Sequence, residues 1–142
     1  MTLLTPSREE LESDYSDYRH LPALSLMNPY AQWLITEGKD VENRTWKTKY
    51  RGQVLIHVSQ GQLSRRDHDR ALGFALGANI FMPPPPKRGG IIGVVEIVDC
   101  VDHYDSPWFF GPWGFVITNP RQLPFWPCKG SLGFFRPNLV LP

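Results

Sequence analysis

The pattern of apolar and polar positions along this chain predicts about five or six short strands. The apolar run LPALSLM at 21–27 predicts a buried strand, and QVLIHVSQ at 53–60 alternates with a period of two. In the second of these strands, Val54, Ile56 and Val58 should face the core, and the opposite face then carries Leu55, His57 and Ser59. GGIIGVVEIVDCV at 89–101 is the strongest strand pattern, and Gly93 within it predicts a bulge or a close backbone approach.

Helix signals separate these strands. Ser7 should cap a short helix in SREELESDYSDY, and Ser64 should cap a helix over 64–80. Asn28 and Pro29 are typical of an N-cap followed by proline at the first helical position, so we expect a helix over Tyr30–Glu37 that ends at Gly38.

The second half of the chain is rich in proline. Pro83–Pro86 should form an extended loop, because proline cannot donate to a sheet. A strand is expected over Trp113–Thr118, then a loop holding three prolines, then a last strand near Leu132–Phe135. Together the elements predict an α+β fold, a small mixed β-barrel with two or three peripheral helices. We expect an acidic lead-in over 1–20, flexible or loosely docked, and one domain over 21–142.

Composition restricts the class further. A chain of 142 residues with 42% hydrophobic and 20% charged residues fits one globular domain. Cys100 and Cys128 lie far apart without metal-ligand spacing, so we predict free thiols, no metal and no cofactor. No apolar run is long enough to span a membrane and no signal-peptide pattern is present, so a cytoplasmic protein is expected. Oligomeric state is left open.

Charge is distributed unevenly although the net charge is only +1. The segment 44–66 contains cations and no acid: Arg44, Lys47, Lys49, Arg51, Arg65 and Arg66. Such a stretch suits a phosphate-bearing partner, and a solvated surface is the alternative explanation.

The candidate functional residues lie just before this stretch and at its start. If 40–48 is a strand, then Glu42, Arg44 and Trp46 share one face, with Lys39 at the start. Lys39 would act as a base, nucleophile or phosphate contact in a pocket, or it is an exposed lysine favoured by the preceding helix end. Glu42 and Arg44 would either bind a base and a phosphate or form a structural ion pair, and both roles are compatible.

The segment LSLMNPYAQWLITEGKDVENRTWKTKYRGQVLIHVSQ resembles the opening of an ASCH domain, a member of the PUA-like superfamily. The resemblance is carried by Pro29-Tyr30-Ala31, Glu37-Gly38-Lys39, Glu42-Asn43-Arg44-Thr45-Trp46 and Arg51-Gly52, and covers roughly residues 22–136. It implies a PUA-like barrel with a cleft against the first domain helix and the strand after it. ASCH proteins resemble nucleic-acid binders, and some bacterial relatives are hydrolases of N4-acetylcytidine or proposed ribonucleases.

Two main hypotheses follow, and a third possibility is a small-ligand or protein-binding barrel whose polar strand is structural. In the first, the chain binds RNA, single-stranded nucleic acid or a nucleoside through Tyr30, Arg44, Trp46, Arg51, His57, Ser59, Arg65, Arg66 and Lys129. In the second, it is a metal-independent hydrolase that uses Lys39 with Glu42. The acetylcytidine-hydrolysing relatives have threonine at the position of Glu42, and their catalytic glutamate lies in an insertion without a match here. The choice between binding and catalysis therefore stays open.

Overall fold

The computed structural model describes residues 7–82 and 87–139, so the expected proline loop at 83–86 lies outside the described residues. Within them lie three helices, α1 (Arg8–Tyr15), α2 (Tyr30–Thr36) and α3 (Arg65–Ala78). The strands are β1 (Ala23–Leu26), β2 (Val41–Arg44), β3 (Gly52–Val58), β4 (Gly90–Val101), β5 (Trp113–Pro127) and β6 (Phe134–Phe135). The predicted α+β fold is confirmed.

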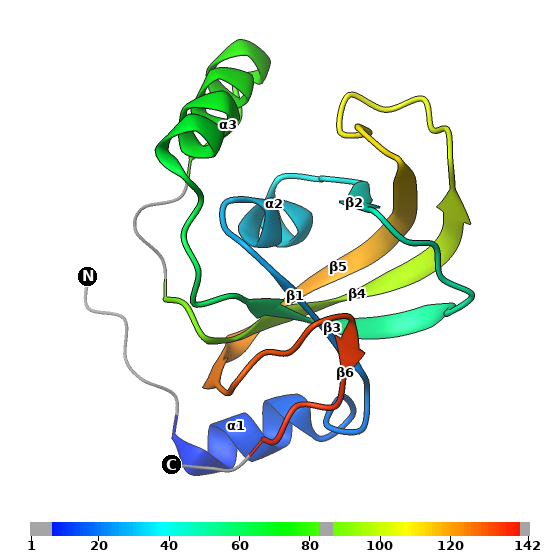
Figure 1. Ribbon diagram of the computed structural model, residues 1–142. Coiled ribbons are helices and arrows are strands. Elements are labelled where there is room, and N and C mark those ends of the chain that lie inside the picture. The colour runs from blue at the N-terminus through cyan, green and yellow to red at the C-terminus, as the bar shows by residue number, and fades with distance from the viewer. Residues whose placement is uncertain (1–6, 83–86, 140–142) are drawn as a thin grey trace.

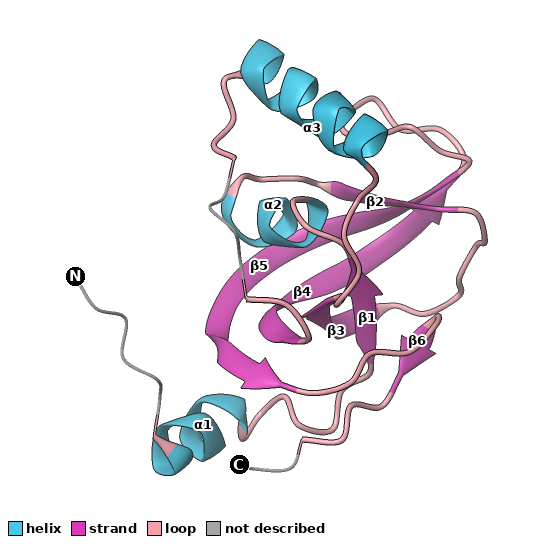
Figure 2. Cartoon of the chain, turned by 60° about the vertical axis from the view of Figure 1, so that its left-hand side comes forward, coloured by secondary structure: helices cyan, strands magenta, loops and turns pink. Residues whose placement is uncertain are grey.

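The strands form one mixed sheet in the order β2-β5-β4-β3-β1-β6. β1 runs parallel to β3, and the other neighbours are antiparallel. The long strands β4 and β5 bend strongly, so the sheet curls into a half-barrel with α2 lying against its concave side (Figure 1). Figure 2 shows α1 and α3 at opposite ends of the molecule, with the sheet between them.

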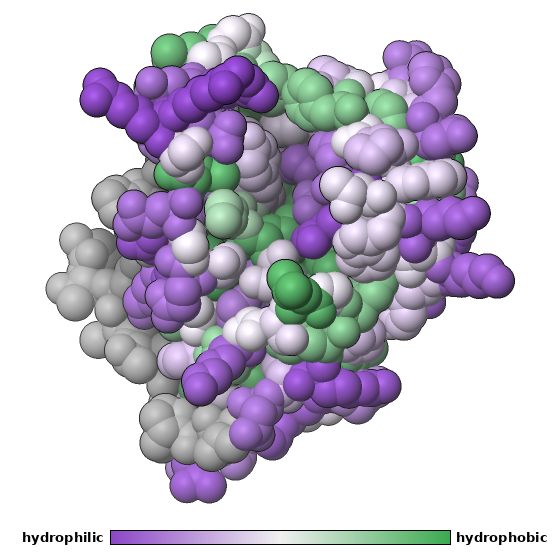
Figure 3. Space-filling view, viewed as in Figure 1, coloured by the Kyte–Doolittle hydropathy of each residue, from purple (hydrophilic) through white to green (hydrophobic). Residues whose placement is uncertain are grey.

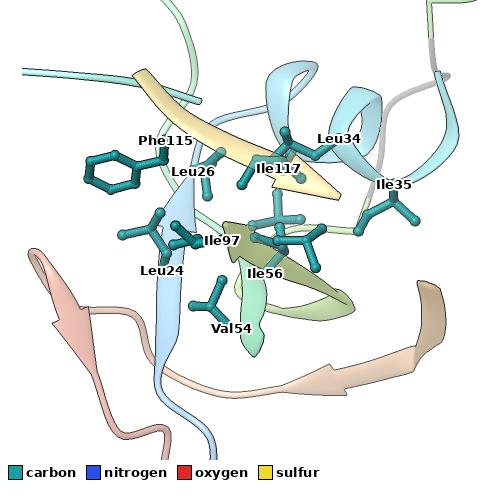
Figure 4. Packing of buried hydrophobic residues seen from close by; sticks show 12 residues of the cluster. Leu24, Leu26, Leu34, Ile35, Val54, Ile56, Ile97, Phe115 and Ile117 are labelled. Carbon is teal, nitrogen blue, oxygen red and sulfur yellow. The ribbon is translucent and has the colours of Figure 1, made fainter. Parts of the chain in front are cut away.

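The main hydrophobic core lies between α2 and the sheet. Figure 4 shows Leu34 and Ile35 of α2 beside inward residues of the sheet, among them Ile56 and Ile117. Val54, Ile56 and Val58 are all buried in this cluster, as their alternation predicted.

The opposite face of β3 is also buried. Leu55 lies in a second cluster with Leu11 and Tyr15 of α1, and His57 is only 1% exposed. Residues 7–20, the described part of the N-terminal segment, are therefore docked firmly rather than loosely, and Tyr15 donates a hydrogen bond to the carbonyl of Pro124. The division of the chain into a lead-in over 1–20 and a domain over 21–142 stays a prediction.

Helix ends follow the predicted side chains in two cases. Ser7 and Ser64 accept hydrogen bonds from Glu10 N and Asp67 N, as N-caps should. In α2 the expected cap was wrong by one residue, because Pro29 is the N-cap and the Asn28 side chain accepts from Gln32 N instead.

Two strand boundaries differ from expectation for reasons of pairing. β2 ends at Arg44, where its register with β5 reaches Trp113 at the start of that strand. The loop expected after Thr118 is instead part of β5, which continues to Pro127. Its proline residues are tolerated because β2 covers only the first part of the outer edge of β5, so among the described strands the rest of that edge needs no ladder donors.

Gly93 makes the predicted close approach. The β4–β5 register shifts beside it, and a Cβ at this position would lie 2.6 Å from the carbonyl oxygen of Arg121.

Candidate functional site

An open cleft of about 510 Å³ lies between α2, β2, α3 and the loop before β5. Figure 3 shows this hollow near the centre of the face, with hydrophobic residues in its depth and hydrophilic residues around it. This first cleft is lined by Ser25, Leu26, Met27, Tyr30, Trp33, Lys39, Glu42, Asn43, Arg44, Thr45, Trp46, Phe74, Trp108, Phe110 and Gly111.

The end of α2 directs Lys39 into this cleft. Gly38 has a φ of +69°, which reverses the chain at little steric cost, and the backbone N–H of Lys39 then donates to the Trp33 carbonyl. The residue is 3% exposed, so the alternative of an exposed lysine is wrong. Its Nζ donates to the Val41 carbonyl and lies 3.1 Å from Glu42 Oε1.

Glu42 is held between two cations. Oε1 accepts from Lys39, and Oε2 accepts from Arg44 Nε at 3.1 Å. The side chains of Lys39, Glu42 and Arg44 are 2%, 10% and 19% exposed. We call these three residues the charged triad, and its two cations and one anion leave an excess positive charge at the cleft.

Aromatic side chains form the walls around the charged triad. The Tyr30 ring lies 6.0 Å from Lys39 Nζ, and its hydroxyl makes no hydrogen bond within the described residues. Burial raises the pKa of that hydroxyl, and Asp67 raises it further, so Tyr30 presents a neutral donor. Trp46 is half-buried because its ring also makes edge contacts with Phe115 and Phe134.

The far wall is the segment 108–111, which Asn43 fixes in place. The Asn43 Nδ2 donates to the Trp108 carbonyl at 3.0 Å, and its Oδ1 accepts from the N–H groups of Phe110 and Gly111. Trp108 packs on Trp33 and Phe74 and is buried, whereas Phe110 is 70% exposed. The Asn43 side chain thus makes three hydrogen bonds to this aromatic wall.

A second open cleft of about 840 Å³ adjoins the first, and Ser25, Met27 and Arg44 line both. Its remaining lining is His57, Ser59, Gln60, Gly89, Pro127, Cys128, Lys129, Gly130, Ser131, Leu132 and Gly133. Unlike the first cleft, it has no phenylalanine, tyrosine or tryptophan in this lining.

His57 lines the second cleft and makes two hydrogen bonds there. Its Nε2 lies 2.8 Å from the Cys128 carbonyl, which can only accept, so this nitrogen carries the proton and Nδ1 accepts from Ser25 Oγ at 2.8 Å. Burial lowers the pKa of His57, and the same effect raises the pKa of the neighbouring Cys128 thiol to about 11. Both groups are therefore neutral at physiological pH.

The predicted site residues fall into three groups. Tyr30, Lys39, Glu42, Arg44 and Trp46 meet in the first cleft, whereas His57, Ser59 and Lys129 meet in the second. The other three predicted residues lie outside both linings. Arg51 Nη2 lies 3.5 Å from Asp99 Oδ1. Arg65 and Arg66 are the first two residues of α3 and are exposed.

Sequence reasoning missed two residues that organise the clefts. Ser25 is a polar residue on an otherwise apolar strand, and Asn43 has the strand parity opposite to Glu42, so both gave a weak signal in the pattern. Their roles depend on His57 and on the 108–111 segment, which lie 32 and 65 or more residues away.

Two further searches concern the described residues alone. Among them, no three His, Cys, Asp or Glu side chains group closely enough to hold a metal ion. None of the three helices has the length and apolar character required to cross a bilayer. Cys100 and Cys128 are free thiols.

The fold and the clefts define a class: a small α+β half-barrel with a charged, aromatic-lined cleft against its second helix. The family model of the ASCH domain matches residues 24–115, more than half of the chain, and the chain therefore belongs to the ASCH domain family. This family is linked to RNA binding.

Curated relatives agree with this assignment. The chain is 25% identical over 120 residues to human Activating signal cointegrator 1 and 24% identical over 120 residues to the mouse protein of the same name. Each alignment covers 76% of this chain and 21% of the relative. The chain thus spans about a fifth of the length of the curated relatives that it matches.

Proposed function

We propose that this ASCH domain binds RNA or another single-stranded nucleic acid by taking one base or nucleoside into the first cleft. The observation that carries the proposal is the charged triad set within aromatic walls. A planar, polar and anionic ligand matches that combination better than an apolar one does.

The aromatic rings supply the affinity for a base. Tyr30 and Trp46 lie on the cleft wall and are only half-buried, so parts of their rings remain available. Stacking of a base on such a side chain contributes roughly 1–3 kcal/mol and tolerates any base. The neutral Tyr30 hydroxyl adds a hydrogen-bonding group beside the triad.

The triad supplies polar recognition. Arg44 uses one N–H on Glu42 and one on the Ser25 carbonyl, and its remaining donors have no partner in the described part of the chain. A guanidinium with free donors suits a phosphate or a base edge, and Glu42 holds it in position.

Fluorescence anisotropy with labelled RNA of about eight nucleotides tests the proposal. Binding should weaken roughly five- to twentyfold between about 50 mM and about 200 mM salt if two or three phosphates are contacted. Arg44→Gln should weaken binding about tenfold or more, as expected for a lost charge-assisted hydrogen bond. Lys49→Gln removes an exposed cation outside both clefts and is the matched control. The proposal would be refuted if the dissociation constant stayed in the millimolar range or weaker. It would also be refuted if Arg44→Gln and Lys49→Gln changed the affinity equally.

The hydrolase alternative has one observation in its favour, namely that Lys39 and Glu42 meet at the cleft. However, both oxygens of Glu42 already accept from cations and Lys39 is almost fully buried, an arrangement that suits binding better than proton transfer. Incubation with RNA and with N4-acetylcytidine in the presence of a chelator distinguishes a binding protein from a metal-independent hydrolase. Turnover that disappears in Lys39→Ala would make the chain a hydrolase.

A further inference from the structure

The two clefts share a wall, and Arg44 stands at the junction between them. Ser25, Met27 and Arg44 are common to both linings. Within this shared wall the Arg44 Nη2 donates to the Ser25 carbonyl at 3.0 Å and Nε is held by Glu42. The guanidinium is therefore fixed on two sides, and the residue lines both clefts while some of its donors have no partner in the described part of the chain.

The two clefts differ in chemistry. The first has six aromatic side chains in its lining, whereas the second has serines, Gln60 and Lys129 and no phenylalanine, tyrosine or tryptophan. The first suits a stacked base, and the second suits a sugar and phosphate. Lys129 is exposed on this second cleft and has no hydrogen bond or ion pair within the described residues, so its charge is available to an anion.

A hydrogen bond and a close contact hold the base of the second cleft in place. His57 donates from Nε2 to the Cys128 carbonyl, which holds the start of the 128–133 segment. Gly130 lies so close that a Cβ there would be 2.6 Å from His57 Cε1 and 3.0 Å from Ser25 Oγ. The Ser25–His57 pair therefore positions the segment that carries Lys129.

We propose that the two clefts form one continuous site for at least two consecutive nucleotides of a single strand, with Arg44 holding the phosphodiester between them. This inference rests on the proposed function and names its ligand: a strand that continues beyond the bound base rather than a free nucleoside. The base enters the first cleft, and the sugar and phosphate of its neighbour lie along the second, within reach of Lys129.

Isothermal titration of nucleosides and dinucleoside monophosphates tests this inference. Each dinucleotide should bind about tenfold or more tightly than the corresponding nucleoside, because it adds a charge-assisted contact between its phosphodiester and Arg44. Replacing the linkage by an uncharged methylphosphonate should abolish most of this gain. Lys129→Ala should reduce the further gain measured from dinucleotide to trinucleotide, whereas Lys49→Ala should leave it unchanged.

The outcomes separate the inference from the proposed function. Nucleosides and dinucleotides of equal affinity would overturn the continuous site while the first cleft still binds a base. A gain that survives the methylphosphonate change would overturn the role of Arg44 as a phosphodiester contact. Binding of no nucleoside, dinucleotide or longer strand would refute the proposed function itself.

Discussion

Lys39 Nζ lies 3.1 Å from Glu42 Oε1 at the wall of the first cleft, where the two side chains are 2% and 10% exposed. Arg44 Nε lies at the same distance from the other carboxylate oxygen. One carboxylate thus compensates two cations, and all three side chains are largely buried at the cleft wall. Removing its charge would leave both cations uncompensated, and that cost is far larger than for a surface pair.

Glu42→Gln should therefore lower the free energy of unfolding by about 3 kcal/mol, as expected when one partner of a buried ion pair is lost. Urea denaturation measures this change. The double variant Lys39→Met with Glu42→Gln should lose less stability than the two single variants lose together. In the double variant Lys39 is no longer a buried cation without its carboxylate.

The exposed pair Arg8–Glu12 provides the control for this experiment, since its side chains are 68% and 48% exposed. Glu12→Gln should change the free energy of unfolding by less than about 1 kcal/mol. Equal effects of Glu42→Gln and Glu12→Gln would show that the triad does not depend on its carboxylate.

The neighbourhood of Glu42 and Arg44 could be predicted from the sequence because strand parity is a local property. The burial of Lys39 could not, since a lysine after a helix end has the same local pattern whether it is exposed or covered. The cleft around Lys39 is completed by residues such as Trp108, which lie far along the chain. The residue pattern left both possibilities open for Lys39, and the resemblance to ASCH domains implied a cleft at this place.

The second cleft was even less accessible to sequence reasoning. It depends on a hydrogen bond between His57 and the carbonyl of Cys128, 71 residues away. The course of β5 shows the same limit, because its prolines indicate a loop locally. They are tolerated in this strand only because β2 leaves most of its outer edge free, and pairing of that kind is a property of the whole sheet.

Asn43 gives a second prediction, about the aromatic wall. Asn43→Ala removes three hydrogen bonds to Trp108, Phe110 and Gly111, and should lower the free energy of unfolding by about 1–3 kcal/mol. It should also weaken RNA binding, because the wall is no longer fixed. Asn43→Asp keeps the acceptor for the two N–H groups. Its free energy of unfolding and its affinity for RNA should therefore lie between those of Asn43→Ala and the wild type. Binding and stability unchanged in Asn43→Ala would show that the 108–111 segment does not depend on the Asn43 hydrogen bonds.

His57 gives a prediction about pH. Burial lowers its pKa in the folded state below the ordinary value of 6.5. Between 6.5 and that lower pKa the unfolded chain binds a proton that the folded chain does not, so stability must fall as pH falls through this window. Above 6.5 both states are neutral at this residue, and its contribution to stability is fully present.

Urea denaturation of the wild type and of His57→Gln across this window measures the effect. The variant should be less stable at pH 8 and should lose less of its stability on acidification than the wild type does. His20→Gln changes an exposed imidazole and should keep the wild-type pH dependence. Parallel pH profiles for the wild type and His57→Gln would contradict the assignment of a buried neutral His57.

A pair of glycine substitutions tests the close approach of β4 to β5 at Gly93. A Cβ at Gly93 would lie 2.6 Å from both the Arg121 carbonyl oxygen and Ile35 Cδ1, and the backbone oxygen cannot move aside easily. Gly93→Ala should therefore lower the free energy of unfolding by about 1–3 kcal/mol through overpacking. Gly73 lies in α3, where an added Cβ meets nothing within 4 Å. Gly73→Ala should therefore raise the free energy of unfolding by about 0.5–1 kcal/mol through helix propensity. Thermal unfolding of the two variants should thus move in opposite directions, and a shift of the same sign in both would refute the close approach at Gly93.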